Sequence, residues 1–138
     1  ENRAKSARLI RAAECGLTDT DYPSVSIGNL SSHRAVSQKL GRDLSALRWR
    51  TNIWLDGLAP WEEFDWIGRI IEIGEVQFEI CERVQRCLAT TANPETGRRD
   101  ADTLGILQTW DHQDFCVYAR VLNTGTIHLN DSAKAPTP

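Results

Sequence analysis

The sequence contains no methionine and no run of about 18 apolar residues. A transmembrane helix needs about 20 consecutive apolar residues, so the second absence predicts that the chain has no membrane span. A natural reading frame begins with methionine, whereas this chain begins with Glu1. We therefore interpret it as a fragment or a processed piece, whose first residues say nothing about targeting.

A large excess of charge of one sign is also missing. The chain has 16 basic and 19 acidic residues, a formal net charge of −3, and no stripe of lysine and arginine. Surfaces that bind nucleic acid or anionic membranes usually carry such a stripe. We therefore expect neither nucleic acid nor an anionic membrane among the partners.

Cysteine is sparse and unpaired in the sequence. The four cysteines, Cys15, Cys81, Cys87 and Cys116, include no Cys-x-x-Cys pair. A disulfide scaffold would be denser in cysteine, and a structural zinc site usually shows paired short spacings. The pattern predicts reduced thiols in a cytoplasmic protein.

Several catalytic signatures are absent as well. The chain has no Gly-x-Ser-x-Gly elbow, phosphate-binding loop or dinucleotide fingerprint. The three histidines have no metal-like partner at i+2 or i+4, and we interpret His33 as a surface helix residue and His112 as a loop residue. The acidic run 62–65 lies between aromatic residues and is more typical of a turn with an aromatic anchor than of a catalytic carboxylate pair.

The sequence does contain many short extended segments around two helical ones. A helix is expected over residues 29–41, started by Ser31 or Ser32 and ended by Gly41, and a second over 102–110. Strands are expected at 23–27, 48–55, 67–73, 76–80, 115–122 and 126–129.

The length of 138 residues fits a single domain with its own core. We predict a mainly β fold with one or two helices (α+β), in which the sheet is twisted or barrel-like. Residues 1–20 are expected to be a lead-in segment with at most one strand, and residues 132–138 a loose tail.

The segment 48–55 alternates between two kinds of side chain. One face would carry Trp49, Thr51, Ile53 and Leu55, and the other Arg48, Arg50, Asn52 and Trp54. This alternation predicts a strand with one packed face and one face of hydrogen-bond donors. Guanidinium and amide groups suit a carboxylate, a phosphate or a heterocycle edge, although a solvated outer face would show the same pattern.

Cys87 directly follows Arg86 and precedes a threonine-rich run and a turn sequence at 93–97. A neighbouring cation favours the thiolate form of cysteine. A thiolate is a soft ligand that suits molybdenum, copper(I), zinc or iron–sulfur centres. Most buried cysteines, however, are inert small hydrophobes, so the residues alone leave both interpretations open.

Several short motifs follow one another along the chain: Arg48-Trp49-Arg50-Thr51-Asn52-Ile53, Asp65-Trp66-Ile67-Gly68, Ile73-Gly74, Arg86-Cys87-Leu88-Ala89-Thr90-Thr91, Asn93-Pro94-Glu95-Thr96-Gly97, Tyr118-Ala119-Arg120-Val121, Gly125-Thr126-Ile127 and Asp131. In this order they resemble the MOSC domain, which is found at the C-terminus of molybdenum cofactor sulfurases and in the mitochondrial amidoxime-reducing component. The resemblance leads us to assign residues 21–131 to a MOSC domain.

The resemblance implies a MOSC-type, β-barrel-like fold that binds the molybdenum–molybdopterin cofactor. It implies that Cys87 is the metal ligand and the catalytic residue, and that Arg50, Asn52, Arg86 and Tyr118 contact the cofactor. For the amidoxime-reducing branch it implies an oxidoreductase acting on small N-hydroxylated substrates, with electrons from a separate donor protein. The alternative is a non-catalytic cofactor carrier, or a sulfur-transfer module with a persulfide on Cys87.

The chain departs from the family pattern at several points. Many relatives have a second cysteine where this chain has Val84, and a glycine where it has Cys116. Relatives also carry an N-terminal β region that supplies part of the phosphate-binding surface, and that region is missing here. A third interpretation is therefore a structural fragment whose function needs that region. No iron–sulfur motif is present, so the electrons would come from another protein.

Overall fold

The computed structural model describes residues 18–135. The predicted lead-in therefore lies mostly outside the described residues, as do the last three residues of the predicted tail. The elements in chain order are β1 (Ser24–Asn29), α1 (Leu30–Leu40), β2 (Ile53–Leu55), β3 (Ile70–Ile73), β4 (Val76–Gln85), α2 (Thr103–Gln108), β5 (Asp114–Val121) and β6 (Ala133–Lys134), with short 3-10 helices at Ala46–Trp49, Glu62–Trp66 and Leu88–Thr91.

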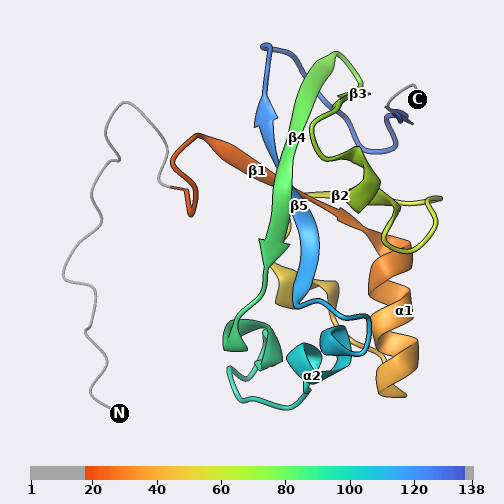
Figure 1. Ribbon diagram of the computed structural model, residues 1–138, viewed down its shortest axis with the longest axis vertical. Helices are drawn as coiled ribbons and strands as arrows, with labels where there is room; N and C mark the ends of the chain where they lie inside the picture. The colour runs from red at the N-terminus through yellow and green to blue at the C-terminus, as the bar shows by residue number, and fades with distance from the viewer. Residues whose placement is uncertain (1–17, 136–138) are drawn as a thin grey trace.

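The six strands form one twisted sheet that nearly closes into a barrel, in the order β2-β1-β5-β4-β3-β6. β1 and β2 are parallel and joined through α1, whereas the other neighbouring strands are antiparallel. β4 and β5 run along the long axis of the molecule, with α1 and α2 near one end and β3 near the other (Figure 1). This architecture confirms the predicted mainly β, barrel-like fold with two helices.

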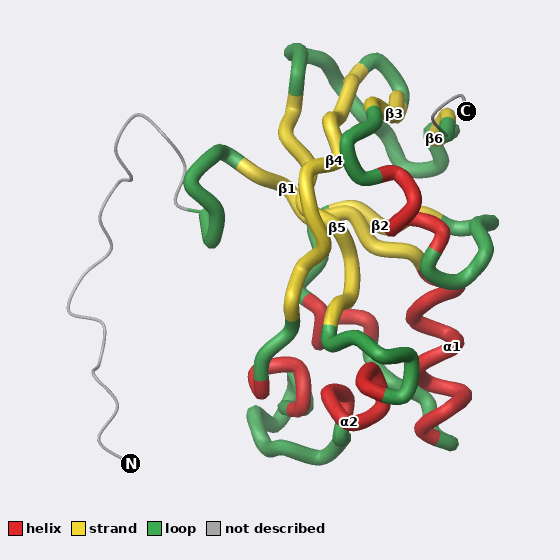
Figure 2. The backbone as a smooth tube through the Cα atoms, in the orientation of Figure 1, coloured by secondary structure: helices red, strands yellow, loops and turns green. Residues whose placement is uncertain are grey.

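The hydrophobic core has two parts, which meet along β5. One part fills the inside of the curved sheet and includes Ile27, Phe78 and Ile80. The other part includes Trp49 and Phe115. Figure 2 shows α1 and α2 at the end of the sheet away from β3. The second part forms the base on which the site described below is built.

The residues on either side of α1 explain why the helix begins and ends where it does. The Oδ1 atom of Asn29 accepts a hydrogen bond from Ser31 N at 2.8 Å and caps the first turn, so the prediction of a serine cap was wrong. Ser32 instead donates to the buried carboxylate of Glu63. Gly41 ends the helix in the left-handed region at φ 71°, as predicted.

The predicted strand 48–55 was wrong over its first half. Residues Ala46–Trp49 form a 3-10 helix, Arg50 takes a left-handed conformation with φ 51°, and only Ile53–Leu55 joins the sheet. The alternation of polar and apolar residues was misleading. Arg48 and Trp49 are both buried, each against different neighbours, and do not lie on opposite faces of a strand.

Other strand boundaries differ in ways that the pairing explains. β4 continues to Gln85, five residues beyond the predicted end, because it pairs with β5 through two register shifts. Residues 126–129 form no strand. The tail expected to be loose contains β6, whose Ala133 pairs with Ile73 of β3.

Candidate functional site

A polar pocket of about 380 Å³ lies between β1, the 3-10 helix Ala46–Trp49 and the segment that follows β4. We call it the arginine pocket, because Arg48, Arg50 and Arg86 all line it. All five of the predicted site residues lie in its wall: Arg50, Asn52, Arg86, Cys87 and Tyr118. The structure thus brings the predicted residues together, while their roles stay predictions.

Arg86 is fixed in the wall by main-chain carbonyls rather than by a carboxylate. Its Nε donates to Phe115 O and its Nη1 to Trp49 O, both at 2.9 Å. The main chain of Arg86 is tied to Gln113 in both directions, with Arg86 N donating to Gln113 O at 2.9 Å. No ion pair of Arg86 is found within residues 18–135, so its positive charge is available to an anion in the pocket.

Of the two polar atoms in the side-chain amide of Asn52, only the oxygen has a hydrogen-bond partner within residues 18–135. Its Oδ1 accepts hydrogen bonds from the main-chain N and the hydroxyl of Ser26, both at 2.9 Å. Within the described residues its Nδ2 has no acceptor, which leaves that group as a donor at the pocket wall. The parallel pairing of β1 and β2 begins at the next residues, Ile27 and Ile53, and sets this arrangement.

Cys87 is exposed and lies directly before the 3-10 helix Leu88–Thr91. Its carbonyl accepts hydrogen bonds from Thr90 N at 3.2 Å and from Thr90 Oγ1 at 3.1 Å. No group of three or more His, Cys, Asp or Glu side chains in the described part of the chain could hold a metal ion. A metal at Cys87 would therefore need most of its ligands from a cofactor.

Tyr118 lies at the side of the pocket near the loop that precedes β1. Its hydroxyl donates to Asp19 Oδ2 at 3.5 Å. Burial raises the pKa of Tyr118, and the carboxylate of Asp19 raises it further. Tyr118 is therefore a neutral hydrogen-bond donor at physiological pH.

Arg48 is a pocket residue that sequence reasoning placed on the donor face but did not assign to the site. Its side chain is only 2% exposed, and its Nη2 donates to Asp100 Oδ1 at 2.6 Å. Its Nη1 donates to Thr91 O at 3.2 Å. The sequence does not indicate that Arg48 pairs with Asp100, because the two residues lie 52 positions apart.

Two buried donors in this pocket have no hydrogen-bond partner. Among residues 18–135, only three buried side-chain nitrogen or oxygen atoms lack one, and two of these are Arg48 Nε and Arg86 Nη2. A buried donor without a partner costs about 1 to 3 kcal/mol. Both arginines line the arginine pocket, where a ligand rich in acceptor atoms would give these donors partners.

Cys116 is buried next to the pocket in an unusual conformation. Its φ of 71° lies in the left-handed region, which explains why glycine would suit this position. Its Sγ lies 2.9 Å from Thr51 Oγ1, and a Cβ atom on Gly28 would approach the same sulfur to 2.9 Å. Burial raises the pKa of Cys116 to about 11, so it remains a neutral thiol.

Two polar residues away from the pocket correct the sequence interpretation. His33 is buried rather than on the surface, with Nε2 3.0 Å from Leu44 O and Nδ1 accepting from Trp49 Nε1 at 3.0 Å. Glu63 is fully buried, and burial raises its pKa despite a hydrogen bond from Asn29 Nδ2 at 2.8 Å. Both residues join helical segments to the core.

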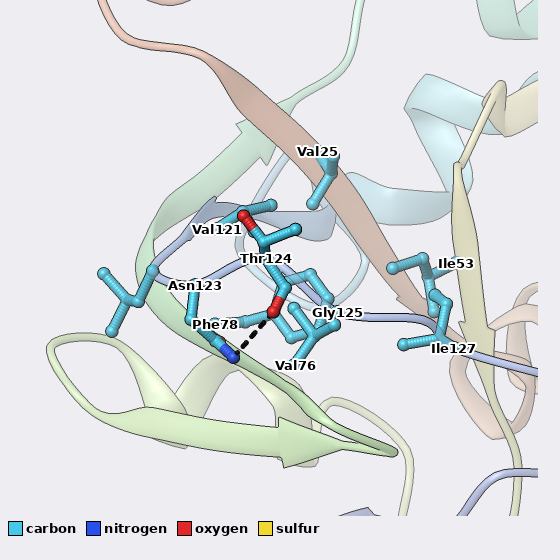
Figure 3. Close-up of a pocket in the computed structure, with 10 residues that line it drawn as sticks. Val25, Ile53, Val76, Phe78, Val121, Asn123, Thr124, Gly125 and Ile127 are labelled. Carbon is cyan, nitrogen blue, oxygen red and sulfur yellow. Dashed lines mark hydrogen bonds between the residues drawn. The ribbon is translucent and has the colours of Figure 1, made fainter.

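A second pocket of about 510 Å³ has the opposite character and is lined mainly by aliphatic side chains. Figure 3 shows Val25 and Ile53 on one side of it, with Val76, Phe78 and Val121 on the other. We call it the apolar pocket. Asn123 Nδ2 donates to Thr124 O at 3.3 Å, within the loop at its edge (Figure 3).

None of the helices in residues 18–135 is long and apolar enough to cross a membrane.

A model of the MOSC domain family matches residues 19–134. The chain is 37% identical over 105 residues to a molybdenum cofactor sulfurase from Drosophila grimshawi, which covers 70% of this chain and 13% of that protein. It is 26% identical over 145 residues to mitochondrial amidoxime-reducing component 1 from Mus musculus, which covers 94% of this chain and 42% of that protein. The chain thus spans less than half the length of either relative.

A crystal structure of YiiM from Geobacillus stearothermophilus has a similar fold, with a TM-score of 0.62. The match covers 83% of this chain and 54% of that one, at 20% sequence identity. At this identity the likeness concerns the fold alone.

Proposed function

The chain belongs to the MOSC domain family, and we propose that its arginine pocket binds the molybdenum–molybdopterin cofactor of an oxidoreductase that reduces N-hydroxylated compounds. Two of its relatives are a molybdenum cofactor sulfurase and an amidoxime-reducing component. The domain would be residues 21–131, within a longer protein.

The observation that carries the proposal is the pair of partnerless buried donors, Arg48 Nε and Arg86 Nη2. A pterin with a phosphate group offers several acceptor atoms and negative charge, which guanidinium groups bind strongly. Asn52 Nδ2 and the exposed guanidinium of Arg50 add donors to the same wall. The residues present therefore fit the cofactor.

Cys87 supports the metal part of the proposal. Its thiol is exposed at the wall of the pocket, and thiolates are soft ligands of the kind that molybdenum accepts. When bound, the cofactor would supply the two-electron chemistry. The protein would hold the pterin through its arginines and present one sulfur ligand.

For an N-hydroxylated substrate, the reaction would break the N–O bond. Two electrons and two protons convert the N–OH group into N–H and release water. We propose that the electrons come from a separate donor protein. Tyr118 also lies in the wall, and its neutral hydroxyl would donate to a substrate oxygen by exchanging its hydrogen bond to Asp19 Oδ2 at 3.5 Å for one to the substrate.

The enzyme proposal is tested with the longer natural protein, loaded with cofactor in cells. We expect it to reduce an aromatic amidoxime to the amidine with a competent electron donor, and the Cys87→Ala variant to lose this activity. Loaded wild-type protein that reduces no N-hydroxylated compound would contradict the enzyme proposal.

The exposure of Cys87 also favours a second candidate, a cofactor carrier or sulfur-transfer module. Its thiolate can attack the outer sulfur of a donor persulfide, which breaks the donor's S–S bond, forms a persulfide on Cys87 and releases the donor as a thiol. This exchange needs no turnover of an N-hydroxylated substrate. This candidate predicts bound molybdopterin, or a persulfide on Cys87 detected by mass spectrometry, in a protein that shows no reductase activity.

A further inference from the structure

The carboxylate of Asp100 makes several of the hydrogen bonds that hold the segment 88–101, which directly follows Cys87. The side chain of Asp100 accepts hydrogen bonds from Arg48 Nη2 at 2.6 Å, from Asn93 Nδ2 at 3.1 Å and from Arg42 Nη2 at 3.4 Å. These donors come from the 3-10 helix beside the pocket, from the turn that follows Cys87 and from the residues just after α1. Asp100 therefore joins three separate parts of the chain.

Arg48 is the partner that connects Asp100 to the arginine pocket. Its side chain is 2% exposed, whereas that of Asp100 is 26% exposed. A buried guanidinium needs an opposite charge beside it, and Asp100 is the only carboxylate paired with Arg48 among the described residues. Arg48 makes a second bond to the same segment, from Nη1 to Thr91 O at 3.2 Å.

A short series of hydrogen bonds continues from Thr91 to Cys87. Thr91 Oγ1 donates to Leu88 O at 2.7 Å, and Thr90 donates to Cys87 O through both its main-chain N and its hydroxyl. Thr90 is itself buried, with its hydroxyl 2.8 Å from that of Thr103 at the start of α2. The main chain at Cys87 is therefore held by the turn that Arg48 and Asp100 secure.

We propose that Asp100 is a positioning residue for Cys87. Acting through Arg48, it holds the turn after Cys87 against the pocket wall, so that the thiol stays beside the donors of Arg48 and Arg86. The inference rests on the proposed cofactor site for the identity of the ligand, but the position of Cys87 can be tested without any ligand.

The test compares Asp100→Asn with a matched control, Arg42→Gln. The first variant removes the charge that faces Arg48. The second removes the exposed Arg42 side chain, which donates to Asp100 Oδ2 at 3.4 Å and to Asp100 O at 2.8 Å, and leaves the pair with Arg48 in place. In the cofactor-free chain, amide hydrogen exchange is measured at Thr90 and Thr91 and, for reference, at Ile80 of β4. We expect exchange in Asp100→Asn to rise about tenfold at the two threonines and to stay unchanged at Ile80.

The second measurement is the ratio of molybdenum to pterin in the longer protein loaded in cells. A purely structural role would lower both contents together, whereas a misplaced Cys87 lowers molybdenum relative to pterin by about tenfold. We expect this fall in Asp100→Asn, recovery of most of the ratio in Asp100→Glu, and no change in Arg42→Gln.

The possible results separate the positioning role of Asp100 from the proposed cofactor-binding function. Unchanged exchange at Thr90 and Thr91 would overturn the positioning role, and so would faster exchange with an unchanged ratio of molybdenum to pterin. If the wild-type protein contains no pterin, the proposed function fails, and the exchange measurement alone then decides whether Asp100 positions Cys87.

Discussion

The arginine pocket and the apolar pocket lie on opposite sides of the same two strands. Ser24 and Ser26 of β1 face the arginine pocket, whereas Val25 between them faces the apolar pocket. At the start of β2 the same change occurs from Asn52 to Ile53. A step of one residue along an extended chain therefore separates a wall of donors from a wall of aliphatic side chains.

The difference between the two pockets shows how binding and stability are divided in this domain. The apolar pocket continues the hydrophobic core, and its base includes Phe78, which is 2% exposed. The arginine pocket instead keeps two buried donors without partners, Arg48 Nε and Arg86 Nη2. We therefore expect substitutions at the first pocket to change the free energy of unfolding alone, and substitutions at the second to change ligand binding as well.

The largest expected effect on stability comes from the apolar side. Phe78→Ala removes a buried aromatic ring, and we expect it to lower the free energy of unfolding by about 3 to 5 kcal/mol, measured by urea denaturation. Pterin retention per folded molecule should not change. A variant of near-normal stability, or one that loses pterin while folded, would break the division between the pockets.

Arg86→Met tests the arginine pocket. The substitution leaves Phe115 O and Trp49 O without their donor, and we expect a loss of about 2 to 3 kcal/mol in the free energy of unfolding together with loss of pterin binding. The matched control is Arg83→Met near the end of β4, where the partly exposed pair with Asp114 at 3.8 Å contributes less than about 1 kcal/mol. Equal pterin retention in the two variants would contradict the assignment of Arg86.

The two cysteines near the arginine pocket should differ in reactivity. Cys87 is exposed, while Cys116 is fully buried with a pKa raised to about 11. At pH 8 we expect iodoacetamide to modify Cys87 in the folded protein and Cys116 only after unfolding, as read by peptide mass spectrometry. Rapid modification of Cys116 in the folded protein would show that the reagent reaches this side chain, and would contradict its burial.

The raised pKa of Cys116 also makes the free energy of unfolding depend on pH, so that it falls as the pH rises. The folded state favours the neutral thiol, so this contribution is fully present below the unfolded pKa of about 8.5. It is lost as the pH rises toward the folded pKa of about 11. A Cys116→Ala variant should therefore lose less stability than wild type between these pH values in urea denaturation.

The smallest effect is expected at the edge of the apolar pocket. Val121 is 44% exposed, and Val121→Thr should change the free energy of unfolding by less than about 0.5 kcal/mol and leave pterin retention unchanged. A larger change in the free energy of unfolding or in pterin retention would mean that Val121 contributes to the core or to the ligand site.

Much of the fold could be predicted from the sequence, because the relevant signals are local. Gly41 marks the end of α1, and the period of two in β4 gives its buried face. The strand expected at 48–55 failed because the same alternation arises when Arg48 is buried by Asp100 and Trp49 by the core. Neither partner is near in sequence, so tertiary contacts overrode the local pattern.

The same limit applies to the candidate site. Its five predicted residues came from a family resemblance, and the structure places them in one pocket. Arg48 as a pocket donor, and Asp100 as its counter-charge, depend on a contact across 52 residues. His33 was misplaced on the surface for a similar reason, since its buried partners Leu44 and Trp49 lie beyond the helix that carries it.

The most direct test of the account is the molybdenum content of the longer protein, purified from cells that supply the cofactor, for wild type and Cys87→Ala. If Cys87 is the protein ligand and the arginines hold the pterin, Cys87→Ala should retain pterin but lose molybdenum by about tenfold or more. Equal molybdenum in the two proteins would contradict the assignment of Cys87.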